Sequence, residues 1–139
     1  PYVAPNCMLY RPGGAMAPMF EAVISEADTR PQTNIPVEAI KAPILLVSGK
    51  ADALWPSYAM GERIAAQLKS KNFAYPVQLL AYEGAGHMVF MGDPSTPAAN
   101  AMAKSPPNPM LGGTGEANLA AWKDNWPKAM AFFDAALKE

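Results

Sequence analysis

The stretch that decides the fold is "APILLVSG" (42–49), followed by "SYAMGERIAAQLKSK" (57–71) and "PVQLLAY" (76–82). The first run lies between Pro43 and Gly49 and has no polar alternation, so it predicts a strand covered on both faces, as in a parallel sheet. The last run predicts a second short strand. Between them, apolar residues recur every fourth position, which predicts an amphipathic helix. The order strand, helix, strand is a right-handed crossover unit and predicts an α/β fold.

Length and composition indicate one domain. The chain has 139 residues, of which 50% are hydrophobic and 17% are charged, as is usual for one soluble globular domain. We expect a loop-rich segment (1–34) with a short helix at 19–28, the strand–helix–strand unit (35–87), a long loop rich in Pro and Gly (88–113), and C-terminal helices (114–139). Because long loops in compact domains are usually functional, 88–113 is a candidate lid.

The C-terminal segment carries an apolar stripe at helical spacing, which predicts packing against the core. Its members are Trp122, Trp126, Met130, Phe133 and Leu137. Pro127 interrupts the pattern, because its ring removes a backbone donor and crowds the preceding turn. We therefore expect either a kink or two consecutive helices that meet near Trp126.

Charge and cysteine content exclude several classes of function. The net charge is −1, and the 11 Lys and Arg residues are scattered, so no basic surface for nucleic acid is expected. No apolar run reaches the roughly 20 residues that cross a bilayer. The single cysteine, Cys7, excludes an internal disulfide and gives no support for a zinc site, and we expect neither metal nor cofactor. The first residue is Pro1, which suggests a processed product or a fragment; a cytoplasmic location is favoured.

Two residues at the ends of the predicted strands form a candidate catalytic pair. His87, the only histidine, closes "EGAGH" (83–87), and Asp52 closes "SGKAD" (48–52). Taken singly, each has an ordinary explanation, a loop histidine and a turn-forming aspartate. Reactive groups of open α/β sheets, however, lie in loops beyond the carboxyl ends of the strands, so the two can meet there. A carboxylate that accepts from imidazole Nδ1 leaves Nε2 able to take a proton. The order Asp before His also agrees with that of α/β-hydrolases, and together these points favour catalysis.

Three stretches resemble a known family: "IPVEAIKAPILLVSGKADALWPS" (35–57), "YEGAGHMVF" (82–90) and "LGGTGEANLAAWKDNWPKAMAFF" (111–133). They are similar to the C-terminal catalytic domain shared by acyl-CoA thioester hydrolases and bile acid-CoA:amino acid N-acyltransferases, a branch of the α/β-hydrolases. Gly-x-x-Asp and Gly-x-Gly-His are generic to α/β-hydrolases. The motifs "ALWPS" and "LGGTGEANLAAW" are specific to this branch.

The resemblance implies chemistry on an acyl-CoA thioester without a cofactor. It implies Asp52 as the acid of a catalytic triad, His87 as the general base, and a Ser or Cys nucleophile that attacks the thioester carbonyl. It further implies that Trp55 and Pro56 line the rim of the substrate site.

The chain departs from the family at the nucleophile. No Gly-x-Ser-x-Gly or Gly-x-Cys-x-Gly elbow is present in the sequence: Ser48 lacks a Gly two positions before it, and Cys7 has no flanking glycines. We therefore expect the C-terminal part of an α/β-hydrolase fold without its nucleophile strand, inactive alone, whose partner is the remainder of the catalytic domain. Two alternatives stay open. One is another α/β-hydrolase, a carboxylesterase or a dienelactone hydrolase-like enzyme, and the other is a non-catalytic α/β binding module.

Overall fold

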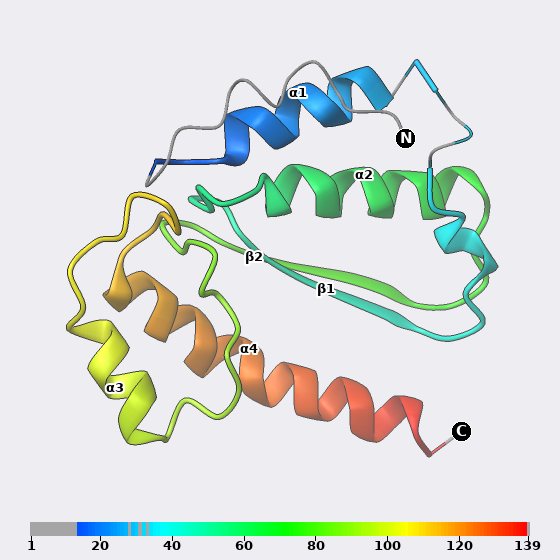
Figure 1. The fold of residues 1–139 in the computed structure, drawn as a ribbon. Coiled ribbons are helices and arrows are strands. Elements are labelled where there is room, and N and C mark those ends of the chain that lie inside the picture. The colour runs from blue at the N-terminus through cyan, green and yellow to red at the C-terminus, as the bar shows by residue number, and fades with distance from the viewer. Residues whose placement is uncertain (1–13, 28, 31, 33, 139) are drawn as a thin grey trace.

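Two parallel strands lie between helices in the computed structural model of the chain (Figure 1). The structure describes residues 14–138 apart from 28, 31 and 33; Cys7 lies outside the described residues. In chain order the elements are α1 (Ala17–Ala27), the 3₁₀ helix η3 (Val37–Ala39), β1 (Ile44–Gly49), α2 (Ser57–Ser70), β2 (Val77–Tyr82), α3 (Pro97–Ala103) and α4 (Gly115–Ala136). Helices α1 and α2 lie on one side of the sheet, and α3 and α4 lie on the other.

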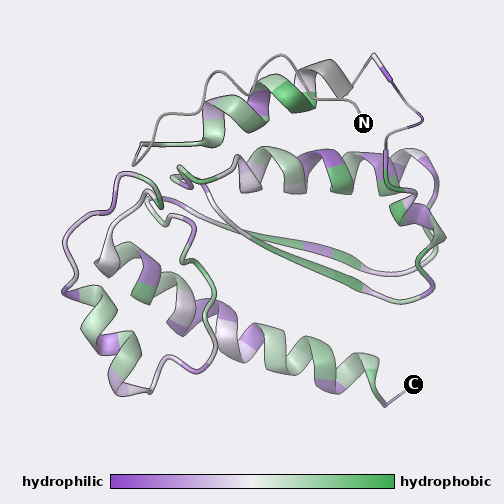
Figure 2. Ribbon diagram, in the orientation of Figure 1, coloured by the Kyte–Doolittle hydropathy of each residue, from purple (hydrophilic) through white to green (hydrophobic). Residues whose placement is uncertain are grey.

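The central unit is the strand–helix–strand arrangement that the sequence predicts. β1 and β2 pair in parallel from Ile44↔Val77 to Gly49↔Tyr82, and α2 connects them and packs against both. Both strands are largely hydrophobic (Figure 2), because α2 covers one face of the sheet and α4 the other. The α/β class is therefore confirmed.

The core lies at the carboxyl end of the strands. Ala85, Val89 and Ala121 are buried together, and Val47 and Tyr82 pack against them. This cluster joins the end of the sheet, the loop after β2 and helix α4. This buried cluster therefore lies next to the predicted pair of Asp52 and His87.

Two segments differ in detail from the expectations. The helix expected at 19–28 is present as α1, with bounds Ala17–Ala27. The segment 88–113, expected as a long loop, contains the helix α3, which packs against α4. Thr96 caps α3 by accepting a hydrogen bond from Ala99 N–H, and Pro97 takes the first helical position, where its missing donor costs nothing.

Helix α4 is one continuous helix, so of the two alternatives expected near Trp126, a kink or two consecutive helices, the second is wrong. Pro127 lies inside it and cannot donate to the carbonyl of Lys123. Both residues are exposed, so water can take the place of the missing donor.

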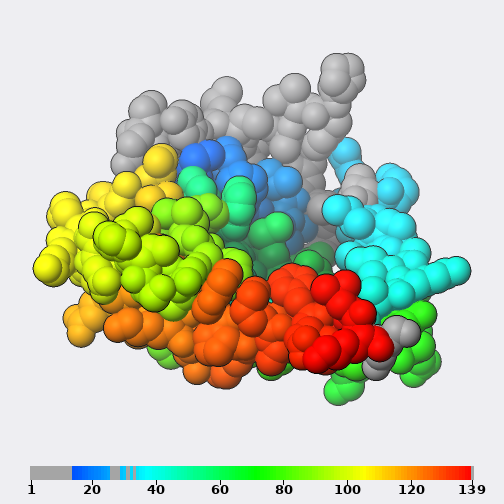
Figure 3. Space-filling view, turned by 90° about the horizontal axis from the view of Figure 1, so that it is seen from below, coloured from blue at the N-terminus to red at the C-terminus, as the bar shows by residue number. Residues whose placement is uncertain are grey.

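The packing predicted for the stripe on α4 holds only for part of it. Trp122 is 4% exposed, whereas Trp126 is half-buried beside Phe90, with ring centroids 6.0 Å apart. Further along, Phe133 and Leu137 are 51% and 84% exposed. Figure 3 shows α4 running across this face of the molecule. The second half of the helix therefore presents apolar side chains to the outside.

Candidate active site

Asp52 and His87 lie together beyond the carboxyl ends of β1 and β2. Asp52 Oδ2 is 3.2 Å from His87 Nδ1. The Asp52 side chain is 2% exposed and the His87 side chain 24% exposed. Because the strands are parallel and adjacent, their following loops meet at one edge of the sheet, which brings together two residues 35 positions apart.

Main-chain donors hold the Asp52 carboxylate. Its Oδ1 accepts hydrogen bonds from Leu54 N–H at 3.0 Å and from Trp55 N–H at 3.2 Å. Oδ2 is thereby directed at the imidazole. With Nδ1–H donating to Asp52, the ring carries its lone pair on Nε2, the tautomer that a general base requires.

A third loop, residues 111–114, lies against both of these loops. Leu111 C=O accepts from His87 N–H at 2.8 Å, and Gly112 forms an isolated antiparallel bridge with Asp52. A Cβ on Gly86 would overlap the main chain of Gly112, and one on Gly112 would overlap the carbonyl of Ala51. Gly112 also has a φ of +68°, a conformation that disfavours other residues. Glycines at both positions thus let the three loops meet backbone to backbone.

One face of α4 holds the main chain around His87. Three buried side chains at 118, 122 and 125, spaced as neighbours on one face, each bond to the loop after β2. Asn118 Oδ1 accepts from Gly86 N–H at 2.9 Å, Trp122 Nε1–H donates to Met88 C=O at 2.6 Å, and Asn125 Nδ2–H donates to Val89 C=O at 2.8 Å. We call Asn118, Trp122 and Asn125 the α4 clamp.

The α4 clamp was not predicted from the sequence. Its first two residues fall inside "LGGTGEANLAAW" (111–122), which the sequence marked as specific to the family without giving it a role. A usable signal was present: two Asn residues lie on the same helical face as an apolar residue, and buried Asn needs partners. The clamp gives this motif a structural role, since it fixes the backbone on both sides of His87.

The comparison with protein families agrees with this architecture. A family model described as BAAT / Acyl-CoA thioester hydrolase C terminal matches residues 14–139. The chain belongs to this family. The search of curated proteins found no match. The resemblance stated from residue 35 onward is thus confirmed, and it extends to the segment that contains α1.

Membership of the BAAT / acyl-CoA thioester hydrolase C-terminal family points to an acyl-CoA thioesterase- or acyltransferase-like domain. No described helix is long and apolar enough to cross a membrane. Within the same residues, no group of three or more His, Cys, Asp or Glu side chains could hold a metal ion.

The two rim residues implied by the family resemblance have different environments. The Trp55 ring lies edge-on to the His87 imidazole, with centroids 4.6 Å apart and planes at 84°, and it is 40% exposed. The Phe20 ring of α1 also lies near Trp55, with ring centroids 6.1 Å apart. Pro56 is buried, and its carbonyl accepts from Met60 N–H at the start of α2. Trp55 is therefore beside the candidate base, whereas Pro56 begins the helix.

Ser48 is buried and hydrogen-bonded. It is 3% exposed at the end of β1, and its hydroxyl donates to Ser57 C=O at 3.2 Å. Ser57 Oγ in turn donates to Gly49 C=O at 3.3 Å. These bonds join the end of β1 to the start of α2.

Proposed function

We propose that the chain supplies the general base and its orienting carboxylate to a nucleophile–His–Asp triad that cleaves acyl-CoA thioesters. The observation that carries the proposal is the contact between Asp52 Oδ2 and His87 Nδ1, made by a nearly fully buried carboxylate with an imidazole that is partly exposed. Family membership supplies the class of substrate.

In the first step, His87 Nε2 takes the proton of a Ser or Cys nucleophile as it attacks the thioester carbonyl. Asp52 stabilises the imidazolium that forms, without taking the proton itself. The carbon–sulfur bond then breaks, and the acyl group stays on the nucleophile. The sulfur of CoA takes the proton from His87, and CoA leaves as the thiol.

In the second step, His87 accepts a proton from water, which attacks the acyl-enzyme. The acyl–nucleophile bond breaks, His87 returns the proton to the nucleophile, and a free carboxylic acid leaves. If an amine takes the place of water, the same residues yield an amide. Analysis of the product distinguishes hydrolysis from transfer.

We further propose that the nucleophile comes from the remainder of the catalytic domain. The sequence contains no elbow motif. Ser48 is buried, and its hydroxyl donates a hydrogen bond to Ser57 C=O at the start of α2. Reading the coding frame upstream for Gly-x-Ser-x-Gly or Gly-x-Cys-x-Gly tests this directly. A frame that opens at this chain would favour the non-catalytic module instead.

The decisive experiment measures thiol release from acyl-CoA by the full protein that the reading frame encodes. His87→Ala should lower kcat about 10²- to 10⁴-fold or more, because it removes the base and leaves the nucleophile without a group that takes its proton. Asp52→Asn should lower kcat strongly by favouring the wrong tautomer. The matched control is Asp134→Asn, whose carboxylate pairs with Lys138 on the surface of α4. Near-normal turnover by His87→Ala would refute the assignment.

A further inference from the structure

Trp55 contacts both members of the candidate pair. Its main-chain N–H donates to Asp52 Oδ1 at 3.2 Å. Its indole lies against the His87 imidazole, with ring centroids 4.6 Å apart and planes at 84°. This nearly perpendicular arrangement is one that aromatic rings prefer. A single residue therefore contacts the carboxylate through its backbone and the candidate base through its side chain.

The imidazole needs side-chain contacts to fix its orientation. Leu111 and the α4 clamp hold the main chain around His87, but a fixed main chain still leaves rotation about the two side-chain bonds of histidine. The contact between Nδ1 and Asp52 Oδ2 is 3.2 Å long, at the upper end of the range for N–H···O hydrogen bonds. An indole packed against the ring limits its rotation sterically and so adds to what this one contact can do.

The backbone of Trp55 is fixed on both sides of the residue. Pro56 follows it, and a proline restricts the conformations of the residue before it. The Trp55 carbonyl accepts from Ser57 N–H at 2.7 Å, and the Trp55 N–H is bonded to the Asp52 carboxylate. Because tryptophan has only two rotatable side-chain bonds, a fixed backbone leaves the indole few orientations.

Helix α1 supports the indole. The Phe20 ring lies nearly perpendicular to that of Trp55, at 87°, with centroids 6.1 Å apart. The first turn of α1 is bonded to the loop after β1, because Met16 N–H and Ala17 N–H both donate to Ala53 C=O, at 2.8 and 2.9 Å. The loop that carries the carboxylate and the indole thus also holds the helix that packs against the indole.

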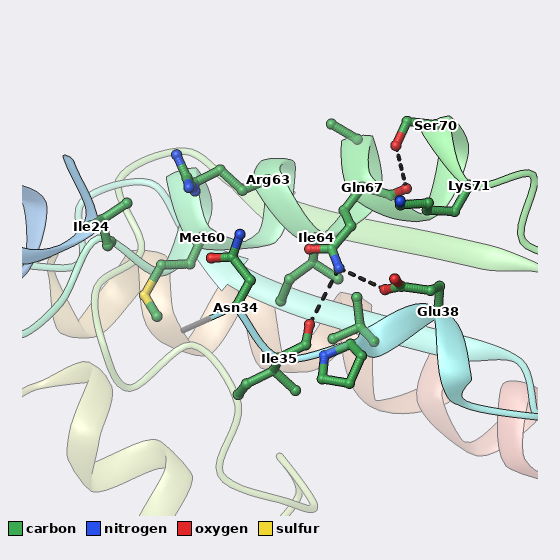
Figure 4. A pocket seen from close by; sticks show the side chains of 13 residues that line it. Ile24, Asn34, Ile35, Glu38, Met60, Arg63, Ile64, Gln67, Ser70 and Lys71 are labelled. Atoms are coloured by element: carbon green, nitrogen blue, oxygen red, sulfur yellow. Dashed lines mark hydrogen bonds between the residues drawn. The ribbon is translucent and has the colours of Figure 1, made fainter. Parts of the chain in front are cut away.

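The indole lies outside the groove between α1 and α2 (Figure 4). The residues that line this groove come from α1, residues 34–38 and α2, and Trp55 is not among them. The lining combines apolar side chains with three charged ones, Glu38, Arg63 and Lys71. Lining of this groove therefore does not account for the placement of the indole, whereas contact with the imidazole does.

We propose that Trp55 is a positioning residue, whose indole keeps the imidazole of His87 in the orientation in which Nδ1–H meets Asp52. The inference rests on the proposed function and gives Trp55 a role beyond the rim of the substrate site. A rim residue acts on the substrate, so its loss raises KM. A positioning residue acts through the base, so its loss lowers kcat.

The first test measures the orientation of the ring without catalysis. The full protein is labelled with ¹⁵N-histidine, and the imidazole signals that disappear in His87→Ala are assigned to His87. At a pH where the ring is neutral, these signals should show the proton on Nδ1. Trp55→Ala and Trp55→Leu should each shift them toward a mixture of tautomers, because a ring turned away from Asp52 can carry its proton on either nitrogen. Trp55→Phe keeps a planar ring and should keep the Nδ1–H tautomer.

Tyr75→Ala is the matched control. Tyr75 is 38% exposed, close to the 40% of Trp55, and its ring also contacts another ring, that of Phe73. It precedes β2, at the opposite end of the strand from His87, so its loss should leave the tautomer unchanged. Imidazole signals that stay unchanged in Trp55→Ala and Trp55→Leu as well would overturn the proposal.

The second test measures the kinetics of the full protein with an acyl-CoA. Trp55→Ala should lower kcat about 10- to 10²-fold and change KM less than about threefold, since a displacement of about an ångström can cost 10²-fold in rate. Trp55→Phe should recover most of kcat. A raised KM with unchanged kcat, in a protein whose turnover depends on His87, would refute the positioning role and leave the proposed function intact. The expected change of tautomer in a protein without thioesterase activity would refute the proposed function and retain the positioning role.

Discussion

Asn118 Oδ1 accepts the main-chain N–H of Gly86 at 2.9 Å, so a buried side chain of α4 holds the residue immediately before the candidate base. Sheet pairing ends at Tyr82, five positions before His87. The position of the imidazole therefore depends on α4 as well as on the sheet, and the family motif around residue 118 is hydrogen-bonded to the loop that carries the candidate base.

Asn118→Ala should impair both stability and activity. It leaves the buried Gly86 N–H without a partner, which costs about 1–3 kcal/mol of unfolding free energy. Displacement of the imidazole by as little as an ångström can lower kcat by about 10²-fold. Urea unfolding and thioesterase kinetics of the full protein measure the two effects. Asn100→Ala, on the exposed surface of α3, is the matched control and should change neither quantity.

The two tryptophans of α4 should differ in their contribution to stability. Trp122→Ala removes a nearly fully buried ring and its bond to Met88, and it should lower the free energy of unfolding by about 3–5 kcal/mol. Trp126→Ala should cost less than half of that, because its ring is only half-buried beside Phe90. Urea unfolding midpoints of the two variants measure this difference in stability. A larger loss for Trp126→Ala would contradict the packing described for this helix.

The part of the fold that the sequence predicted rests on local patterns. Apolar runs and helical spacing over 42–82 were enough for β1, α2 and β2, because each element carries its own periodicity. The proximity of Asp52 and His87 followed from topology, since adjacent parallel strands end at one edge. The signal for α3 was also local, a Thr cap followed by Pro97, but the surrounding Pro and Gly residues concealed it.

The α4 clamp was missed because its bonds are not local. They join residues 32 to 36 positions apart, and a polar residue on a helix does not reveal which distant carbonyl or N–H it will meet. The expectation of two helices that meet near Trp126, next to Pro127, failed for a different reason. Proline removes one helical hydrogen bond and crowds the preceding turn, but neither effect has to end a helix, and at an exposed position water can bind the carbonyl left without a donor.

Tyr82 predicts a specific response of stability to alkaline pH. Burial, and then the hydrogen bond from its hydroxyl to Asp124, raise the pKa of the Tyr82 phenol well above its ordinary value of 10. The folded state therefore retains this proton when the unfolded chain loses it. The stabilisation is complete below pH 10 and is lost as pH rises above that value toward the folded pKa.

Tyr82→Phe provides the measurement. In the variant, the slope of unfolding free energy against pH above 10 should be shallower than in the unaltered chain, while the slopes at pH 6–8 should agree. Tyr75→Phe, which removes the hydroxyl of a more exposed tyrosine, is the matched control. Identical slopes for Tyr82→Phe and the unaltered chain would show that the pKa of the Tyr82 phenol does not differ between the folded and the unfolded state.

The isolated 139-residue chain should self-associate. Within the described residues the sheet has two strands, so β1 and β2 each keep one edge without a partner strand, and such edges recruit other chains. The second half of α4 adds the exposed apolar residues Phe133 and Leu137. Sedimentation velocity should show dimers or larger species whose fraction rises with concentration. Replacing both residues, Phe133→Lys with Leu137→Lys, should shift the distribution toward monomer if the helix contributes, whereas Lys123→Ala on the exposed side of the same helix should not. A chain that stays monomeric at every concentration would show that neither the sheet edges nor this face of α4 drives association.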